Sequence, residues 1–162
     1  MAKRDKAALY QSLVASLTET RDRLVAAQRV SVEGVTHEDA RAEGDKDMRA
    51  TEASYVARGQ AMRVEALESD LARVVAMKVR KFKPDDPIAL GALVLIASDN
   101  DKRVVFIAPA GGGVRLEDAK GVVHVVTPAS PLGKALLGSR AGDYVTFAKG
   151  GVSEEAEIVE IE

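Results

Sequence analysis

The sequence predicts an α+β protein in which an N-terminal antiparallel helical hairpin precedes an antiparallel sheet that carries one short helix. Residues 3–28 and 48–81 contain no proline and repeat apolar side chains every three or four positions, as amphipathic helices do. After the proline-containing segment Lys81–Pro87 the apolar period changes to two. We therefore expect a coiled-coil hairpin at 1–82, a linker at 81–88 and a β domain at 83–162.

The first predicted helix presents a narrow apolar stripe. Leu9, Leu13, Leu17 and Leu24 lie on one face, and polar residues fill the rest of the surface. Such a stripe suits pairing with one partner helix. The second helix offers that partner, since it repeats apolar residues over the same length and can begin with Asp47 as its N-cap.

The connection between these helices is rich in acids. Gly34 is expected to end the first helix, and Thr36 and Asp39 can cap a short helical piece before a turn at Gly44–Lys46. Carboxylates at this tip (38–47) can simply be solvated, or they can bind a hard divalent cation through oxygen beside a second charged site. The acids of the tip are Glu38, Asp39, Glu43, Asp45 and Asp47.

The second half reads as five short strands and one helix. The strands are expected at 92–97, 103–108, 122–126, 143–148 and 155–161. Ser130 can cap a helix that starts at Pro131 and ends at Gly138. Gly142 and Asp143 form a turn signal before the fourth strand.

Composition narrows the class of protein. The 162 residues include no cysteine, which fits a reducing cytoplasm and leaves no thiolate metal site. The sequence has no apolar run of membrane-spanning length, and its net charge of −2 argues against binding DNA through phosphates. Gly111–Gly113 lacks the Lys-Ser/Thr of a phosphate loop, and His37 and His124 lie too far apart in sequence to predict a metal site.

The run Ala129–Asp143 resembles a known signature. It reads ASPLGKALLGSRAGD, close to the SPLGxALLGxxxGD pattern in the C-terminal domain of bacterial Gre-type transcription elongation factors. The resemblance implies an FKBP-like β domain and a coiled-coil hairpin that enters the secondary channel of RNA polymerase. It further implies an accessory factor, not an enzyme, whose acidic tip helps the polymerase hold a second Mg²⁺ and a water during cleavage of backtracked transcripts.

The tip matches the family pattern only in its first half. Ala40–Asp45 reads ARAEGD and fits the AR-x-x-GD that opens the family tip, which places Asp45 on the first acid. The family's second acid falls on Met48, and Asp47 lies one position early. By resemblance, Asp45 and Asp47 are the candidate ligands of a shared Mg²⁺, with Glu43 beside them. The candidate polymerase-docking residues are Ser130, Pro131, Leu132, Gly133, Gly142 and Asp143.

Several functions remain open from the sequence. A displaced acid pair is compatible with a factor that stimulates cleavage and with one that only occupies the channel and tunes transcription. An FKBP-like domain also suggests a peptidyl-prolyl isomerase, although residues 83–162 offer only three aromatic side chains for a proline slot: Phe106, Tyr144 and Phe147. A coiled-coil adapter is a further alternative. We expect a monomer that binds RNA polymerase, with no sequence-specific DNA binding and no membrane attachment.

Overall fold

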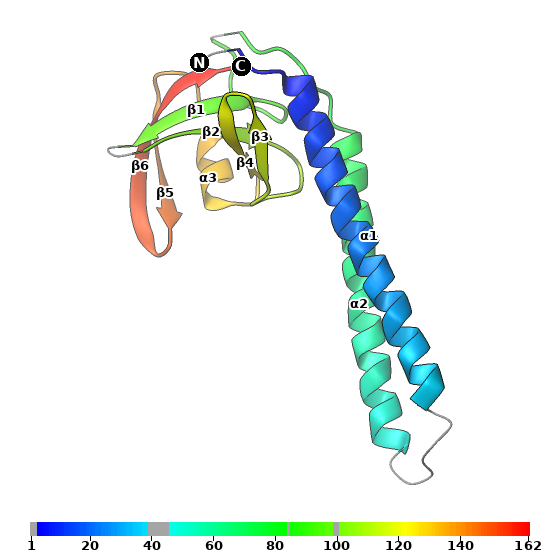
Figure 1. Ribbon diagram of the computed structural model, residues 1–162. Helices are drawn as coiled ribbons and strands as arrows, with labels where there is room; N and C mark the ends of the chain where they lie inside the picture. The colour runs from blue at the N-terminus through cyan, green and yellow to red at the C-terminus, as the bar shows by residue number, and fades with distance from the viewer. Residues whose placement is uncertain (1–2, 39–45, 84, 99–100) are drawn as a thin grey trace.

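The computed structural model describes residues 3–38, 46–83, 85–98 and 101–162. In these residues two long helices precede a mixed sheet that holds one short helix (Figure 1). The helices are α1 (Lys6–Glu38), α2 (Lys46–Val75) and α3 (Pro131–Leu136). The strands are β1 (Leu93–Ser98), β2 (Asp101–Ile107), β3 (Arg115–Asp118), β4 (Gly121–Val126), β5 (Tyr144–Lys149) and β6 (Val152–Ile161).

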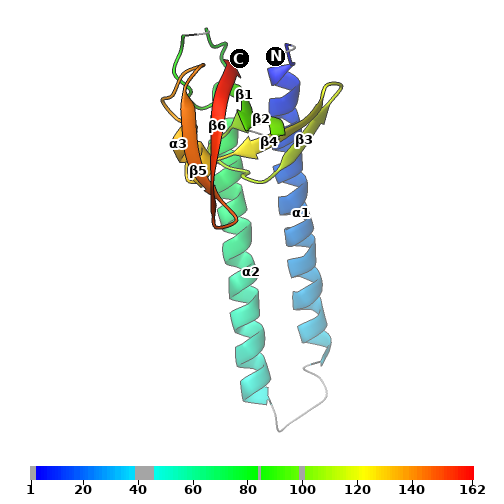
Figure 2. The same ribbon diagram turned by 90° about the vertical axis from the view of Figure 1, so that its left-hand side faces the viewer.

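Helices α1 and α2 lie side by side and antiparallel in both views (Figures 1 and 2), which confirms the predicted hairpin. The expected break at Gly34 is wrong, because α1 continues through it to Glu38. One glycine in a helix costs only about 1 kcal/mol relative to alanine, and neighbouring turns tolerate that. Asp47 lies inside the first turn of α2 and is not its N-cap, since that helix already begins at Lys46.

Helix α2 ends at Val75, earlier than the expected end near Lys81. The Tyr10 hydroxyl donates to the Val75 carbonyl oxygen at 3.1 Å, which satisfies one of the acceptors left free at a helix end. The Met77 amide donates to the Val74 carbonyl oxygen at 3.0 Å and tightens the last turn. The chain therefore leaves the hairpin before the proline-containing linker.

The sheet has the strand order β3-β4-β2-β1-β6-β5 within the described residues. Its expected antiparallel character holds for four of the pairings, but β2 and β4 run parallel, with Val104 opposite Val123. The parallel pair arises because β4 folds back from β3 and inserts between β3 and β2. Strand β3 was not expected, since its sequence Arg-Leu-Glu-Asp contains a single apolar residue.

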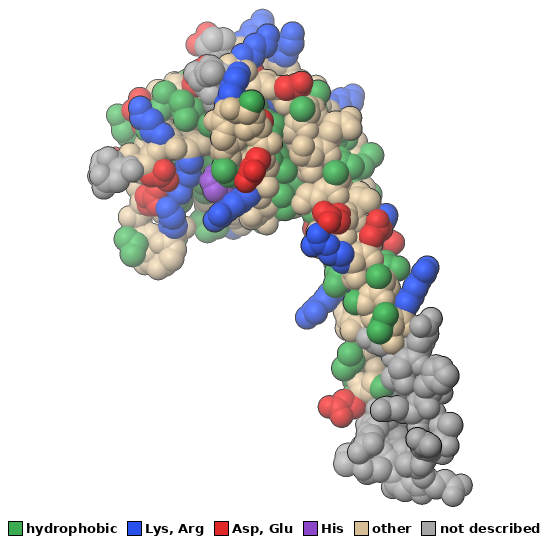
Figure 3. All heavy atoms as spheres, viewed as in Figure 1, with side chains coloured by type: hydrophobic (Ala, Val, Ile, Leu, Met, Phe, Trp, Pro, Cys, Tyr) green, Lys and Arg blue, Asp and Glu red, His purple; other side chains and the backbone are tan. Residues whose placement is uncertain are grey.

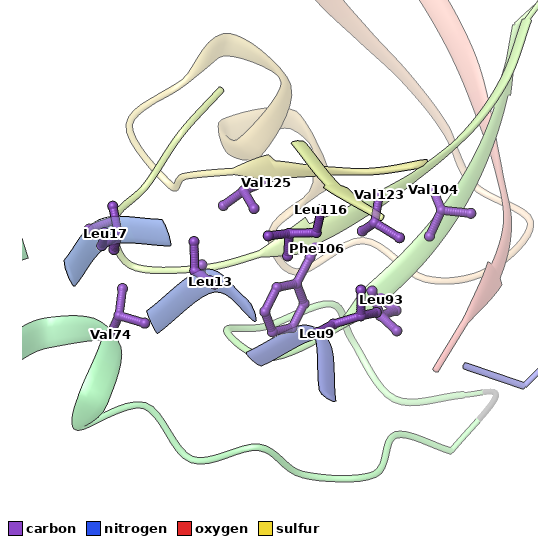
Figure 4. Packing of buried hydrophobic residues seen from close by; sticks show 12 residues of the cluster. Leu9, Leu13, Leu17, Val74, Leu93, Val104, Phe106, Leu116, Val123 and Val125 are labelled. Atoms are coloured by element: carbon purple, nitrogen blue, oxygen red, sulfur yellow. The ribbon is translucent and has the colours of Figure 1, made fainter. Parts of the chain in front are cut away.

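Both faces of the sheet are packed, and alternate residues of β2 serve the two sides. Val104 and Phe106 face the base of the hairpin, where they join a buried cluster with Leu9, Leu13 and Leu17 (Figure 4). Val105 and Ile107 face the opposite side and pack in a second cluster that includes Leu136 of α3. The first cluster crosses the expected division between residues 1–82 and 83–162, so the hairpin base and the sheet share one core.

Beyond this core the hairpin projects away from the sheet (Figure 1). From Thr18 to Glu38, α1 extends for about 30 Å at about 1.5 Å per residue. The described helices include none with the length and apolar character to cross a membrane.

Candidate functional site

The predicted acidic tip joins the far ends of α1 and α2. Glu43 and Asp45 belong to residues 39–45, which lie outside the described residues. Asp47 belongs to the first turn of α2 by its backbone, and its side chain is also outside the description. The ends of the two helices are remote from the sheet (Figure 1).

The predicted helix cap at Ser130 is confirmed. Its Oγ accepts a hydrogen bond from the Gly133 amide at 3.0 Å and donates one to the Thr127 carbonyl oxygen at 2.8 Å. Pro131 occupies the first turn, where its missing N–H needs no partner. Gly133 is buried because the helix starts against the preceding backbone, and a Cβ at this position would overlap the Thr127 carbonyl oxygen.

The turn at Gly142–Asp143 also has a clear structural role. Gly142 has φ +90°, and its amide donates to the Ile158 carbonyl oxygen at 2.7 Å. Asp143 Oδ2 accepts from the Arg140 amide at 2.7 Å, and its carbonyl oxygen accepts from the Ile158 amide at 2.8 Å. Four of the six docking candidates therefore maintain the fold. The other two offer surface, since Pro131 is exposed and Leu132 is half-buried.

A groove that the sequence did not reveal lies on the α3 side of the sheet and has a volume of about 650 Å³. Its floor is apolar and includes Val105, Val122, Val126 and Leu132. Its rim is basic, with Lys102, Arg103, Arg115, Lys120 and Lys149 as lining residues, together with His124 and a single acid, Asp101. We call this feature the basic groove.

Two ion-paired clusters lie at the rim of the basic groove. Glu154 accepts from Arg103 at 2.7 Å and from Lys149 at 3.1 Å. Burial by itself raises the pKa of Glu154, but Lys149 and Arg103 together hold that pKa below its ordinary value. Arg4 pairs with Asp118, and its guanidinium also donates to the Lys120 carbonyl oxygen at 3.0 Å. Figure 3 shows the mixture of basic and acidic side chains on this side of the sheet.

A larger cavity of about 780 Å³ lies between the hairpin base, the linker and the C-terminal strand. Lys6 is buried beside it and donates to the carbonyl oxygens of Arg80 at 2.6 Å and Gly91 at 3.4 Å. Its Nζ also lies 4.8 Å from the centroid of the Phe82 ring. Burial lowers the pKa of Lys6, while Glu162 opposes that effect and Arg80 adds to it. Lys6 therefore fastens the start of α1 to the linker.

Comparison with known proteins identifies the β domain. The family model for the C-terminal domain of transcription elongation factors GreA/GreB matches residues 83–162. Through this domain the chain belongs to the Gre family.

Two relatives and one solved structure show the extent of the similarity. GreA of Rickettsia canadensis is 34% identical over 101 residues, which span 62% of this chain and 59% of that protein. GreA of Xanthomonas campestris pv. campestris is 28% identical over 152 residues and 90% of both chains. The crystal structure of GreA factor homolog 1 (Gfh1) of Thermus thermophilus is 26% identical, with 94% of both chains covered and a TM-score of 0.39.

Three other kinds of site were considered for the described part of this Gre-family chain: a metal site, a phosphate loop and a proline slot. No group of three or more His, Asp or Glu side chains there is placed to hold a metal ion. Gly111–Gly113 forms the connection between β2 and β3, with positive φ at Gly111 and Gly113, and starts no helix. The lining residues of the basic groove include no Phe, Tyr or Trp, so it lacks the aromatic-lined proline slot of a peptidyl-prolyl isomerase.

The sequence does not indicate the basic groove, because its cationic residues come from separate segments of the chain. Lys102 and Arg103 are the second and third residues of β2, Arg115 begins β3, and Lys149 ends β5. Only the strand order brings these positions to one surface. Arg115 lies opposite His124 because β3 pairs with β4, and β3 is the strand that the sequence did not predict.

Proposed function

We propose that this Gre-family chain binds RNA polymerase, inserts its hairpin into the secondary channel and promotes cleavage of backtracked transcripts. The polymerase performs the hydrolysis, and the chain acts as an accessory factor without an active site of its own. The observation that carries this proposal is the hairpin itself, which projects about 30 Å beyond a base that is packed in the core of a Gre-type β domain.

A rigid base matters for delivering a tip. Leu9, Leu13 and Leu17 are almost fully buried between α2 and the sheet, so tilting α1 at its base would break the shared core. Docking of the β domain at the channel rim would therefore fix the direction of the hairpin. Docking of the β domain would in this way also determine where the far end of the hairpin lies in the channel.

At the tip we assign Asp45 and Asp47 as ligands of a Mg²⁺ shared with the polymerase, with Glu43 adding negative charge. Carboxylate oxygens are the protein ligands that this ion prefers, and two carboxylates leave positions for water. Mg²⁺ would supply charge stabilisation and activate the attacking water there. Alone, the tip would bind Mg²⁺ weakly, so the chain carries no cofactor outside the complex.

A second candidate function is occupation of the channel without stimulated cleavage. It is favoured by Met48, which stands where the Gre tip has its second acid, and by the early position of Asp47. A factor of this kind would compete with cleavage factors for the channel and tune transcription.

The experiment is transcript cleavage by stalled, backtracked RNA polymerase. The wild type is compared with Asp45→Asn/Asp47→Asn and with the control Glu65→Gln/Glu68→Gln, which removes the same charge from exposed positions of α2. Stimulation by the wild type and the control, lost in the tip variant with binding retained, supports the cleavage role. Competition with a cleavage factor without stimulation supports the second function. If neither occurs, both are wrong.

The coiled-coil adapter is separated from these functions by mass. A factor that inserts one hairpin is expected to be monomeric in solution, whereas an adapter that dimerises through α1 would have twice that mass. Because the stripe of α1 is already buried against α2 and the sheet, the adapter would have to use another face.

A further inference from the structure

The basic groove occupies the part of the sheet that α3 leaves open. Leu136 of α3 packs over the central strands with Val105 and Ile107. Strand β4 presents Val122 and Val126 on the same face, and Val122 remains 41% exposed. An apolar strip of sheet therefore borders the short helix without being covered by it.

Among the described residues, two cationic side chains around this strip, those of Lys102 and Arg115, have no acidic partner. Within the described residues, the side chains of Lys102, Arg115 and His124 form no hydrogen bond or ion pair. Lys102 and Arg115 are exposed, and the one acid among the lining residues is Asp101. By contrast, Arg4 and Arg103 are engaged with Asp118 and Glu154. The groove thus combines an apolar floor with positive charge that the fold does not use.

We propose that the basic groove holds an acidic, amphipathic segment of a protein partner, and that this partner is the RNA polymerase of the proposed function, on which this inference rests. Apolar side chains of the segment would cover Val122, Val126 and Leu132. Its carboxylates would face Lys102 and Arg115. This charge pairing would orient the segment and speed its capture, because complementary charges at a rim act chiefly on association.

A nucleic acid fits the groove less well. Proteins that bind single strands stack the bases chiefly on Phe, Tyr and Trp side chains, and the lining residues of the groove include none of these. The valine and leucine floor instead requires a ligand with apolar side chains to bury. The groove is also distinct from the Ser130–Asp143 segment, where most of the predicted docking residues serve the fold; only Leu132 belongs to both.

The test measures binding of the labelled full-length chain to RNA polymerase core enzyme across a salt series. The groove variant is Lys102→Glu/Arg115→Glu, and its control is Lys81→Glu/Lys83→Glu, which makes the same charge change at exposed linker positions. We expect the groove variant to bind about tenfold more weakly at low salt, with the difference shrinking as salt screens the rim. The control should bind like the wild type.

A second variant tests the floor. Val122→Thr keeps a β-branched side chain in the strand but replaces one exposed methyl group by a hydroxyl. We expect it to weaken polymerase binding about threefold, and this loss should persist at high salt because it is not electrostatic. A fold check by circular dichroism accompanies each variant.

The outcomes separate the inference from the proposed function. If the wild type fails to bind the polymerase, the proposed function falls and this inference with it. If the wild type binds and both groove variants bind equally well, the groove assignment is wrong while the proposed function stands. If the groove variant loses binding to a 20-nucleotide single-stranded RNA but keeps full affinity for the polymerase, the groove is an RNA surface and the acidic segment is excluded.

Discussion

The Arg4 guanidinium binds the carboxylate of Asp118, which lies 114 positions further along the chain, and the two side chains are only 7% and 22% exposed. The same guanidinium donates to the carbonyl oxygens of Lys120 at 3.0 Å and Gly121 at 3.3 Å. One side chain just before α1 therefore ties the hairpin to the β3–β4 turn. Together with the buried leucines of α1, this contact fixes the hairpin on the sheet.

Replacing Arg4 should destabilise the whole chain. Arg4→Met leaves Asp118 partly buried without its ion pair, and breaking a buried pair from one side costs roughly 3 to 5 kcal/mol. Because Asp118 is partly open to water, we expect a loss of about 2 kcal/mol in the free energy of unfolding, measured with urea. The control Arg23→Met breaks an exposed pair with Glu19 and should change that value by less than about 0.5 kcal/mol. Equal effects of the two substitutions would contradict the anchoring role.

The Arg4–Asp118 pair also predicts a dependence on pH. Burial by itself raises the pKa of Asp118, but the Lys120 amide and the Arg4 guanidinium outweigh it and hold the pKa below the ordinary value. A carboxyl whose pKa is lower in the folded state stabilises the fold above its unfolded pKa of about 3.9 and loses that contribution as pH falls through the folded value.

Asp118→Asn should therefore reduce the acid sensitivity of the chain. The variant will be less stable than the wild type at pH 7, and the difference should narrow as pH falls below about 4. Urea unfolding at several pH values between 7 and 3 measures this convergence. Glu154 titrates in both proteins and forms a common background. A constant difference across that range would show that Asp118 contributes through packing alone.

Leu13 tests whether the hairpin base and the sheet form one cooperative core. It is fully buried among Leu9, Leu17, Val74 and Phe106. Leu13→Ala should lower the free energy of unfolding by about 3 kcal/mol, since it removes buried methyl groups and leaves a cavity. Hydrogen exchange should accelerate together in the first turns of α1 and in β2. Val56→Ala, at an exposed position of α2, is the control, and acceleration confined to α1 would refute a shared core.

Local sequence patterns predicted most helices and strands of this fold, but they did not predict which of these elements pack or pair with one another. The stripe of Leu9, Leu13 and Leu17 indicated a helix, but periodicity does not say whether such a stripe meets a helix or a sheet, and here it meets both. Strand β3 has one apolar residue, too few for a period of two to be visible. The parallel pairing of β2 with β4 depends on β4 inserting between β3 and β2, which no local signal encodes.

The candidate sites show the same limit. The motif that indicated the family is Ser130–Asp143. Its residues form a helix cap, a turn and close backbone contacts, so the fold itself restricts which residues can stand there. The basic groove carries no contiguous motif, because its charges are brought together by strand order. The sequence could therefore indicate the family, but it could not indicate this surface.

Two glycines give opposite predictions for the same substitution. Gly133→Ala places a Cβ against the Thr127 carbonyl oxygen, which belongs to backbone held by the Ser130 hydroxyl, so we expect a loss of about 2 kcal/mol or more. Gly59→Ala adds a Cβ that meets nothing within 4 Å in the middle of α2 and should stabilise the chain by about 0.5 to 1 kcal/mol. Thermal unfolding of both variants measures the contrast, and destabilisation by Gly59→Ala would refute it.

Gln60 interrupts the seam of the hairpin. Apart from Asp70, the half-buried positions of α2 are Ala53, Ala57, Gln60, Val64, Leu67 and Leu71, a repeat of three and four residues on one face of the helix. Gln60 Oε1 is buried and has no hydrogen-bond partner among the described residues. A buried acceptor without a partner costs about 1 to 3 kcal/mol, and a polar residue in such a seam sets register at the expense of stability.

Gln60→Leu should therefore stabilise the hairpin by about 1 kcal/mol, because it removes the unpaired oxygen and adds an apolar side chain to the seam. Urea unfolding of the full chain measures the total effect, and slower hydrogen exchange in the middle of α2 would locate it. Gln11→Leu makes the same substitution on an exposed face of α1 and should have little effect. If Gln60→Leu destabilises the chain while Gln11→Leu does not, the Gln60 amide has a partner that holds the hairpin in register, and the seam is stabilised by polarity at this position.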